Sequence, residues 1–217
     1  MDSSRGLSAM QADLLRAFFA LERRFVLTGG GALVGFHLRH RTSDDIDLFA
    51  KPPVTMDEGY RALEAAALAL GGAVESLRTF PEFRRALVRR GTESVVVDLV
   101  IDRAPDVDQV VEAEHGIRLH SLREIAANKI CALLGRAEIR DLIDLRAILA
   151  TGFDLRAVLA DAERKDGGAS AATLAWLIEG LRIPADAPLP GGVRADELEA
   201  FRVDLVQRLR RLGLPPA

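Results

Sequence analysis

The chain has 217 residues, of which 49% are hydrophobic and 28% charged, a composition that excludes disordered and fibrous classes and predicts a folded globular protein. Its net charge of −3 provides no general electrostatic attraction to nucleic acid, so any contact with RNA would have to be local. The only cysteine, Cys131, cannot form an internal disulfide, which favours a cytoplasmic protein. Charges spread through residues 1–24 indicate an amphipathic helix rather than a signal peptide or membrane span, so no membrane partner is expected.

The apolar pattern predicts a sheet-bearing first part and a helical second part. Helical spacing over 7–23 is followed by a short apolar strand at 24–28 that stops at a glycine turn. The same rules predict helices at 32–40 and 57–70 and strands at 44–50, 73–80, 84–90 and 94–101. From Ser121 onward helices are expected at 122–134, 138–150, 154–165, 170–181 and 194–212. The boundary between the two parts is predicted near Leu119.

A glycine turn and two carboxylates come together in the segment 28–49. Asp45 and Asp47 alternate with apolar residues, so both should point from the same face of a strand. Carboxylate oxygens are ligands that Mg²⁺ prefers, and the backbone amides of Gly29 and Gly30 at a helix start favour a triphosphate. Glycine triplets and Asp-x-Asp are often plain loops, but Asp47 in an apolar strand would be costly without a cation. Their combination predicts a metal and phosphate site.

Lys129 falls on an apolar stripe of the helix predicted at 122–134. A lysine there must either reach solvent or meet anionic partners. A triphosphate is one such partner, and Asp141 and Asp144 on the next helix are another. The second alternative is a salt bridge that ties two helices together, and both can hold.

Two blocks of the sequence resemble one family. Residues 28–49, TGGGALVGFHLRHRTSDDIDLF, resemble the signature of the AbiEii/AbiGii toxin family of nucleotidyltransferases, in the DNA polymerase beta-like superfamily. Its elements are a Gly-Gly turn, an Ala-Leu helix start, Arg-x-Ser and Asp-x-Asp. Residues 121–145, SLREIAANKICALLGRAEIRDLIDL, resemble the downstream pattern of the family, a helical Lys, then Arg, then Arg-Asp-x-x-Asp-Leu. Gly30 departs from the Ser that many relatives in the superfamily carry, so backbone amides alone must contact phosphate there.

The resemblance implies an α/β (α+β) fold, with a mixed-sheet nucleotidyltransferase core over 1–119 and a helical domain over 120–217 that closes the nucleotide site. It also implies roles for individual residues. The metal, Mg²⁺ or Mn²⁺, would be held by Asp45, Asp47 and, from a neighbouring strand, Asp98, for which a strand residue facing water is the alternative. Nucleotide binding would involve Gly29, Gly30, Ser43 and Lys129, and catalysis would involve Asp45, Asp47, Lys129, Asp141 and Asp144.

The activity implied is transfer of a nucleoside monophosphate from a nucleoside triphosphate to an acceptor hydroxyl. The leading hypothesis is a toxin of a toxin–antitoxin system that acts on tRNA, with an antitoxin protein encoded nearby. The alternatives are a small-molecule nucleotidyltransferase of the aminoglycoside or lincosamide kind and a non-catalytic nucleotide-binding module. A cluster of arginines is either a solvated face or a contact for RNA phosphates; it comprises Arg78, Arg84, Arg85, Arg89 and Arg90.

Overall fold

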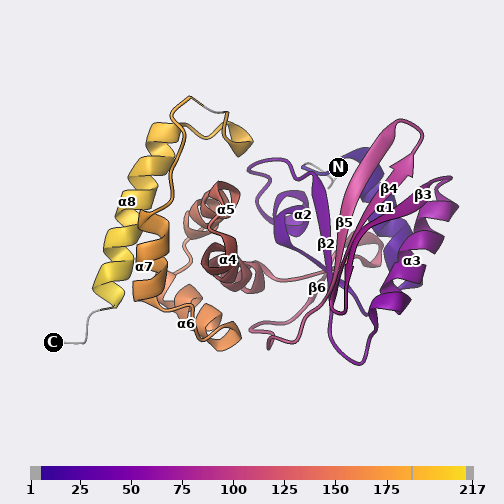
Figure 1. Cartoon of the computed structure of the whole chain (residues 1–217), viewed down its shortest axis with the longest axis horizontal. Helices are drawn as coiled ribbons and strands as arrows, with labels where there is room; N and C mark the ends of the chain where they lie inside the picture. The colour runs from indigo at the N-terminus through magenta and orange to yellow at the C-terminus, as the bar shows by residue number, and fades with distance from the viewer. Residues whose placement is uncertain (1–5, 187, 214–217) are drawn as a thin grey trace. The chain divides into compact units, whose positions relative to one another are not determined.

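The computed structural model describes residues 6–186 and 188–213, which divide into two compact units. The sheet unit contains the described residues up to Arg103 together with Gln109–Ser121. The helical unit contains Ala104–Asp108 and the described residues from Leu122 onward. Figure 1 shows the sheet unit in indigo to magenta and most of the helical unit in brown to yellow. The closing of the helical domain over a nucleotide stays a prediction.

A seven-stranded mixed sheet forms the centre of the sheet unit, and its order is β3-β4-β5-β2-β1-β7-β6. The strands are β1 (Val26–Thr28), β2 (Asp45–Ala50), β3 (Ala73–Phe80), β4 (Phe83–Arg90), β5 (Glu93–Ile101), β6 (Val111–Glu112) and β7 (Arg118–Leu119). β2 pairs in parallel with β5, and β1 with β7, whereas the other neighbours are antiparallel. The predicted α/β fold is confirmed.

Two helices, α1 (Ala9–Leu21) and α3 (Met56–Ala69), cover one face of this sheet (Figure 1). The strand side chains on that face are apolar and buried, among them Ile46, Leu48 and Leu99. Each helix begins with a capping box, in which the hydroxyl of Ser8 or Thr55 accepts a bond from a backbone amide of the first turn. The backbone amide of the same residue donates to the side chain three residues later. Because side chains alternate along a strand, the other residues of β2 and β5 point to the opposite face of the sheet.

The glycine turn is part of a helix rather than a separate loop. Gly29 adopts φ 61°, which a glycine accepts readily, and it opens the short helix α2 (Gly29–Ala32). A π-helical turn, Leu33–His37, continues α2. The helix predicted at 32–40 therefore begins earlier, at Gly29, because this glycine makes the turn by itself. It also ends earlier, at His37.

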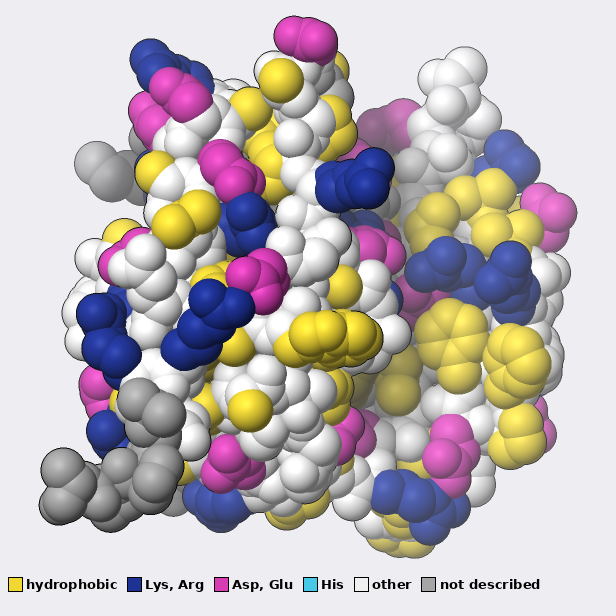
Figure 2. All heavy atoms as spheres, turned by 60° about the vertical axis from the view of Figure 1, so that its left-hand side comes forward, with side chains coloured by type: hydrophobic (Ala, Val, Ile, Leu, Met, Phe, Trp, Pro, Cys, Tyr) yellow, Lys and Arg dark blue, Asp and Glu magenta, His cyan; other side chains and the backbone are white. Residues whose placement is uncertain are grey.

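The helical unit consists of α4 (Leu122–Arg136), α5 (Ile139–Leu149), α6 (Leu155–Lys165), α7 (Ala171–Glu179) and α8 (Ala195–Leu212). Glu124 and Lys165 form a buried ion pair within it. The Glu124 carboxylate also accepts the backbone amide of Val107 at 2.7 Å, and Lys165 donates to the carbonyl of Pro105 at 3.0 Å. These bonds attach Ala104–Asp108 to the helical unit. Figure 2 views a face of the helical unit on which basic and acidic side chains are interspersed.

Among the residues that the structure describes, no helix combines the length and apolar character needed to cross a membrane.

Candidate active site

Asp45 and Asp47 lie on β2, on the face opposite α1 and α3. Along this strand half-buried and buried residues alternate, and Ile46 and Leu48 are the buried ones. Successive side chains of a strand point to opposite faces, so the two carboxylates share a face, as the sequence predicts. Ile46 and Leu48 fix that orientation, because a shift of the strand register by one residue would bury both carboxylates and expose the core residues.

A row of polar residues crosses four neighbouring strands at the position of Asp47. Thr28 on β1 is paired with Asp47, and Asp47 with Asp98 on β5. Asp98 is in turn paired with Arg85 on β4. Paired residues of adjacent strands share a face of the sheet, and their strands lie about 5 Å apart. The candidate third carboxylate is therefore next to Asp47 in the sheet.

Asp98 forms a bidentate ion pair with Arg85. The Arg85 Nε donates to Asp98 Oδ1 at 2.8 Å, and Nη2 donates to Oδ2 at 2.6 Å. Asp98 is only 6% exposed, so the carboxylate of this pair is surrounded mainly by protein atoms and not by water. The hydrogen bonds to Asp98 raise the pKa of the Arg85 guanidinium above its ordinary value, although burial opposes this shift. The charges of Asp45 and Asp47 act in the same direction as those bonds.

Gly29 and Gly30 are in close contact with the residues around the carboxylates. A Cβ atom at residue 29 would lie 2.0 Å from Oδ2 of Asp47, which is too short a distance for two non-bonded atoms. A Cβ atom at residue 30 would lie 2.7 Å from Oγ of Ser43 and 2.9 Å from Nη2 of Arg41. Only glycine at these positions allows the Asp47 and Ser43 side chains to approach the first turn of α2 this closely.

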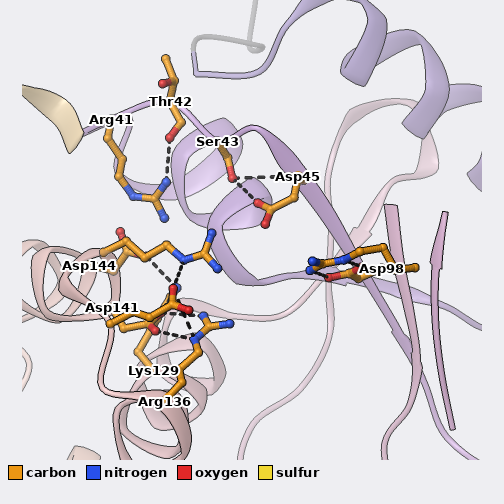
Figure 3. Close-up of polar contacts among 12 residues, drawn as sticks. Arg41, Thr42, Ser43, Asp45, Asp98, Lys129, Arg136, Asp141 and Asp144 are labelled. Carbon is orange, nitrogen blue, oxygen red and sulfur yellow. Dashed lines mark hydrogen bonds and ion pairs between the residues drawn. The ribbon is translucent and has the colours of Figure 1, made fainter. Parts of the chain in front are cut away.

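Ser43 connects the loop before β2 to the first carboxylate. Its hydroxyl donates to Oδ1 of Asp45 at 3.0 Å (Figure 3). Its carbonyl accepts a bond of 2.9 Å from Nε2 of Gln11, a buried residue of α1. Arg41 in the same loop donates to the carbonyl of Thr42 at 2.7 Å. The loop is thus held from α1 on one side and bonded to Asp45 on the other.

The helical unit contains a second charged cluster, centred on Lys129 of α4 (Figure 3). Its Nζ lies 2.9 Å from Oδ1 of Asp141 and 2.6 Å from Oδ2 of Asp144, both on α5. Lys129 is 4% exposed and both aspartates are fully buried. Arg136 adds two bonds to Asp141, from Nε at 2.8 Å and from Nη2 at 3.0 Å. The salt bridge between the two helices is therefore present.

Opposing effects set the pKa of Asp141. Burial alone would raise it, but the hydrogen bonds from Arg136 and the charge and hydrogen bond of Lys129 outweigh burial. The pKa of Asp141 therefore lies below its ordinary value of 3.8, and this carboxylate stays ionised at neutral pH.

The structure brings together six of the predicted site residues in the sheet unit and three in the helical unit. The first group is Gly29, Gly30, Ser43, Asp45, Asp47 and Asp98, and the second is Lys129, Asp141 and Asp144. Their roles in metal binding, nucleotide binding and catalysis stay predictions.

Several of the arginines grouped by sequence are engaged within the sheet unit. Arg84 stacks over the ring of Tyr60, with its Cζ 4.3 Å from the ring centroid, and Arg90 bonds to Asp13 and Glu93. Arg85 forms its ion pair with Asp98. This role was not predicted, although one signal was present: Asp98 interrupts an apolar strand, as a paired charge would.

Sequence reasoning also assigned no chemistry to His120, which lies at the end of the polar row. Its Nδ1 is 2.9 Å from Oγ1 of Thr28, and its carbonyl accepts a bond of 2.9 Å from Nε2 of His37. Its backbone amide donates to the carbonyl of Leu27. No spacing in the sequence could indicate this residue, because the contacts join segments far apart in the chain.

Comparison with protein families finds a match over residues 13–213 to the nucleotidyl transferase AbiEii toxin of type IV toxin–antitoxin systems. The chain belongs to the AbiEii nucleotidyltransferase toxin family. A comparison with curated protein sequences finds no match. The family resemblance of the two motif blocks is thereby confirmed.

Solved structures agree in fold with this AbiEii family member. JHP933 from Helicobacter pylori superposes with a TM-score of 0.57 at 22% identity, covering 95% of this chain and 94% of that one. A second protein from H. pylori, described as a candidate nucleotidyltransferase, superposes with a TM-score of 0.55 at 19% identity, covering 96% of this chain and 100% of the other. At such identities these similarities show the shared fold.

Proposed function

We propose that this chain transfers a nucleoside monophosphate from a nucleoside triphosphate to an acceptor hydroxyl, with a divalent metal held by Asp45 and Asp47. The observation that supports this most is the contact between Asp47 and Gly29. It joins the carboxylate pair to the first turn of α2, and the backbone amides of such a turn favour an anion. Membership of the AbiEii nucleotidyltransferase family supports the same reaction.

The donor atoms suit the proposed metal. Asp45 and Asp47 offer carboxylate oxygens from one strand face, and Mg²⁺ and Mn²⁺ prefer such hard oxygen ligands over nitrogen or sulfur. The absence of a Cβ at Gly29 lets the Asp47 carboxylate lie against the glycine turn, and phosphate oxygens would complete the coordination sphere. When bound, such a metal supplies positive charge to the phosphate oxygens.

In the proposed reaction the acceptor oxygen attacks the α-phosphorus while the bond from that phosphorus to the bridging oxygen breaks. Pyrophosphate leaves with the bonding electron pair. A carboxylate of the site accepts the proton of the acceptor hydroxyl. Ser43 orients Asp45 through its hydrogen bond, and the amides at Gly29 and Gly30 bind the phosphate chain.

Lys129 has a second proposed role besides its salt bridges. An ammonium group has three donors, and two of them are directed at Asp141 and Asp144. The third is the donor that would bind a phosphate oxygen in this proposal. From the family motif we propose that Lys129 contacts the triphosphate, and that Asp141 and Asp144 hold its ammonium in place.

The acceptor we propose is tRNA, and the biological role is that of a toxin paired with an antitoxin protein encoded nearby. The family match supports the toxin role, since this is a family of type IV toxin–antitoxin systems. The tRNA acceptor comes from the resemblance of the two motif blocks. A small-molecule acceptor and a non-catalytic binding module are the outcomes that the experiment must separate from it.

The test is incubation of the purified chain with total tRNA, Mg²⁺ and each α-labelled nucleoside triphosphate in turn. We expect label to appear in the tRNA fraction for at least one nucleotide and to disappear with EDTA. Parallel reactions replace tRNA by an aminoglycoside or a lincosamide. Label in these small molecules alone would establish the small-molecule alternative, and nucleotide binding without any transfer would establish the non-catalytic one.

The RNA-binding surface needs a variant that leaves the sheet intact. Reversing Arg84 or Arg85 would break the stacking on Tyr60 or the Asp98 ion pair. Arg78 is exposed on β3, so Arg78→Glu should leave the fold unchanged. If RNA phosphates contact this strand, transfer to tRNA should fall about tenfold at low salt, with unchanged triphosphate binding.

A further inference from the structure

The Asp98 carboxylate has both of its oxygens committed to Arg85. The two bonds are parallel, from Nε to Oδ1 and from Nη2 to Oδ2, which is the fork arrangement that guanidinium and carboxylate groups form best. A metal ligand needs an oxygen lone pair directed at the ion at about 2.0–2.1 Å for Mg²⁺, with near-octahedral geometry. To become one, Asp98 would have to give up Arg85 or share an oxygen with it.

Burial makes that exchange unfavourable. Asp98 is 6% exposed, and Arg85 lies on the adjacent strand in direct register with it. A guanidinium removed from such a carboxylate must find another anion or water, and a divalent cation placed on the same carboxylate would repel it at close range. If the two cations shared this buried carboxylate, their mutual repulsion would offset part of the attraction that each has for it.

The charge of the three aspartates and Arg85 also matches a single metal. Asp45, Asp47 and Asp98 carry three formal negative charges on one face of the sheet, and Arg85 carries one positive charge beside them. The remainder is −2, which one divalent cation neutralises. A second divalent cation would leave these four residues with a net positive charge before any phosphate binds.

We propose that Asp98 is the ion-pair partner of Arg85 and does not bind a metal. The site then takes one divalent cation, and Arg85 provides the second positive charge. This inference rests on the proposed metal site at Asp45 and Asp47. It replaces the expectation that Asp98 is a third metal ligand. Arg85 is then a positioning residue, which keeps Asp98 away from the metal and carries positive charge toward the face that would receive the triphosphate.

The experiment counts bound Mn²⁺ by electron paramagnetic resonance, without nucleotide, in the parent and four variants. The decisive variant is Arg85→Gln with Asp98→Asn, because it removes the ion pair without changing the net charge of the row. We expect the parent to bind one Mn²⁺, and this double variant to bind one Mn²⁺ with a Kd within about threefold of the parent. Asp98→Asn alone is less informative, because it also removes a negative charge near the metal.

The opposite result, stronger or additional Mn²⁺ binding, is expected for Arg85→Gln alone. It frees the Asp98 carboxylate, so Mn²⁺ should bind at least tenfold more tightly or a second Mn²⁺ should appear. Two Mn²⁺ ions in the parent, or loss of an ion or a tenfold weaker Kd in the neutral double variant, would overturn the proposal. An Arg85→Gln variant with parental Mn²⁺ binding would overturn the role given to Arg85.

The remaining variant, Asp45→Asn with Asp47→Asn, separates this inference from the proposed function. We expect it to bind no Mn²⁺ at the site. Undiminished binding there would contradict the proposed metal site itself, and this inference with it. Circular dichroism of each variant establishes that it is folded, and Arg85→Lys with Asp98 intact substitutes for Arg85→Gln if the neutral variant unfolds. A lysine cannot make the bidentate bond, so it too should admit Mn²⁺ to Asp98.

Discussion

Oδ2 of Asp47 lies against Gly29, so close that a Cβ atom at residue 29 would be 2.0 Å away. The second carboxylate of the Asp-x-Asp pair therefore contacts the first turn of α2. The proposed metal ligands and the proposed phosphate turn are one packed unit, and a change in one should be felt in the other.

Gly29→Ala tests this coupling, and Gly91→Ala is its matched control. Both glycines have positive φ, 61° and 59°, but a Cβ at Gly91 meets nothing within 4 Å. Each substitution should lower the free energy of unfolding by about 1 kcal/mol through backbone strain, and Gly29→Ala should lower it further because its Cβ also meets Asp47. Only Gly29→Ala should displace Asp47, so it alone should weaken binding of Mg²⁺ with a nucleoside triphosphate, by at least about tenfold. Isothermal titration calorimetry measures the binding and urea unfolding measures the stability; equal binding by the two variants would contradict the coupling.

Lys129→Met should separate structure from chemistry when it is compared with Lys165→Met. Both lysines are buried in the helical unit and paired with buried carboxylates. Removal of either should cost about 3–5 kcal/mol of unfolding free energy, because it leaves a buried charge without its partner. Lys129→Met should in addition reduce transfer per folded molecule roughly 30- to 1000-fold, since a lost charge near the phosphates is worth about 2–4 kcal/mol.

The double variant Lys129→Met with Asp144→Asn also removes a carboxylate that Lys129 contacts, and it should recover part of the stability without recovering transfer. Urea unfolding and single-turnover kinetics are the two measurements. If the Lys129 and Lys165 variants lose activity equally once the folded fraction is corrected for, Lys129 is structural and its proposed contact with the triphosphate is wrong.

Acid should weaken the helical unit through Asp141. Its pKa is lowered in the folded state, so the unfolded chain binds the proton more readily. The stabilisation by ionised Asp141 is thus fully present above its ordinary value of 3.8 and is lost as pH falls through the lower folded value. The difference in unfolding free energy between the parent and Asp141→Asn should therefore shrink below about pH 4. Urea titrations from pH 7 to pH 2.5 measure it, and a constant difference would contradict the prediction.

Local patterns in the sequence were sufficient for much of this architecture. Ile46 and Leu48 predict which way Asp45 and Asp47 point, because strand alternation is a short-range property. The apolar stripe around Lys129 indicates that this lysine either reaches solvent or meets anionic partners, and Asp141 and Asp144 on the next helix make their ion pairs foreseeable. Such features need only the period of one element and the position of the next.

Strand register could not be obtained in the same way. The pairing of Asp98 with Asp47 and Arg85 depends on how three strands align, and no local pattern fixes that alignment. β6 and β7 have two residues each, too few for a period, and the contact of His120 with Thr28 joins residues far apart in the chain. The row across the sheet follows from tertiary structure, and the changed interpretation of Asp98 follows from that row.

The most direct test of the account is nucleotide binding by Asp45→Asn with Asp47→Asn, set against Asp44→Asn. Asp44 is the exposed neighbour of the pair and lies before β2, so its loss changes the net charge without touching the proposed ligands. With Mg²⁺ present, a nucleoside triphosphate should raise the melting temperature of the parent and of Asp44→Asn through preferential binding to the folded state. The double variant should be folded and show no rise. A rise in the double variant equal to that of the parent would contradict the account.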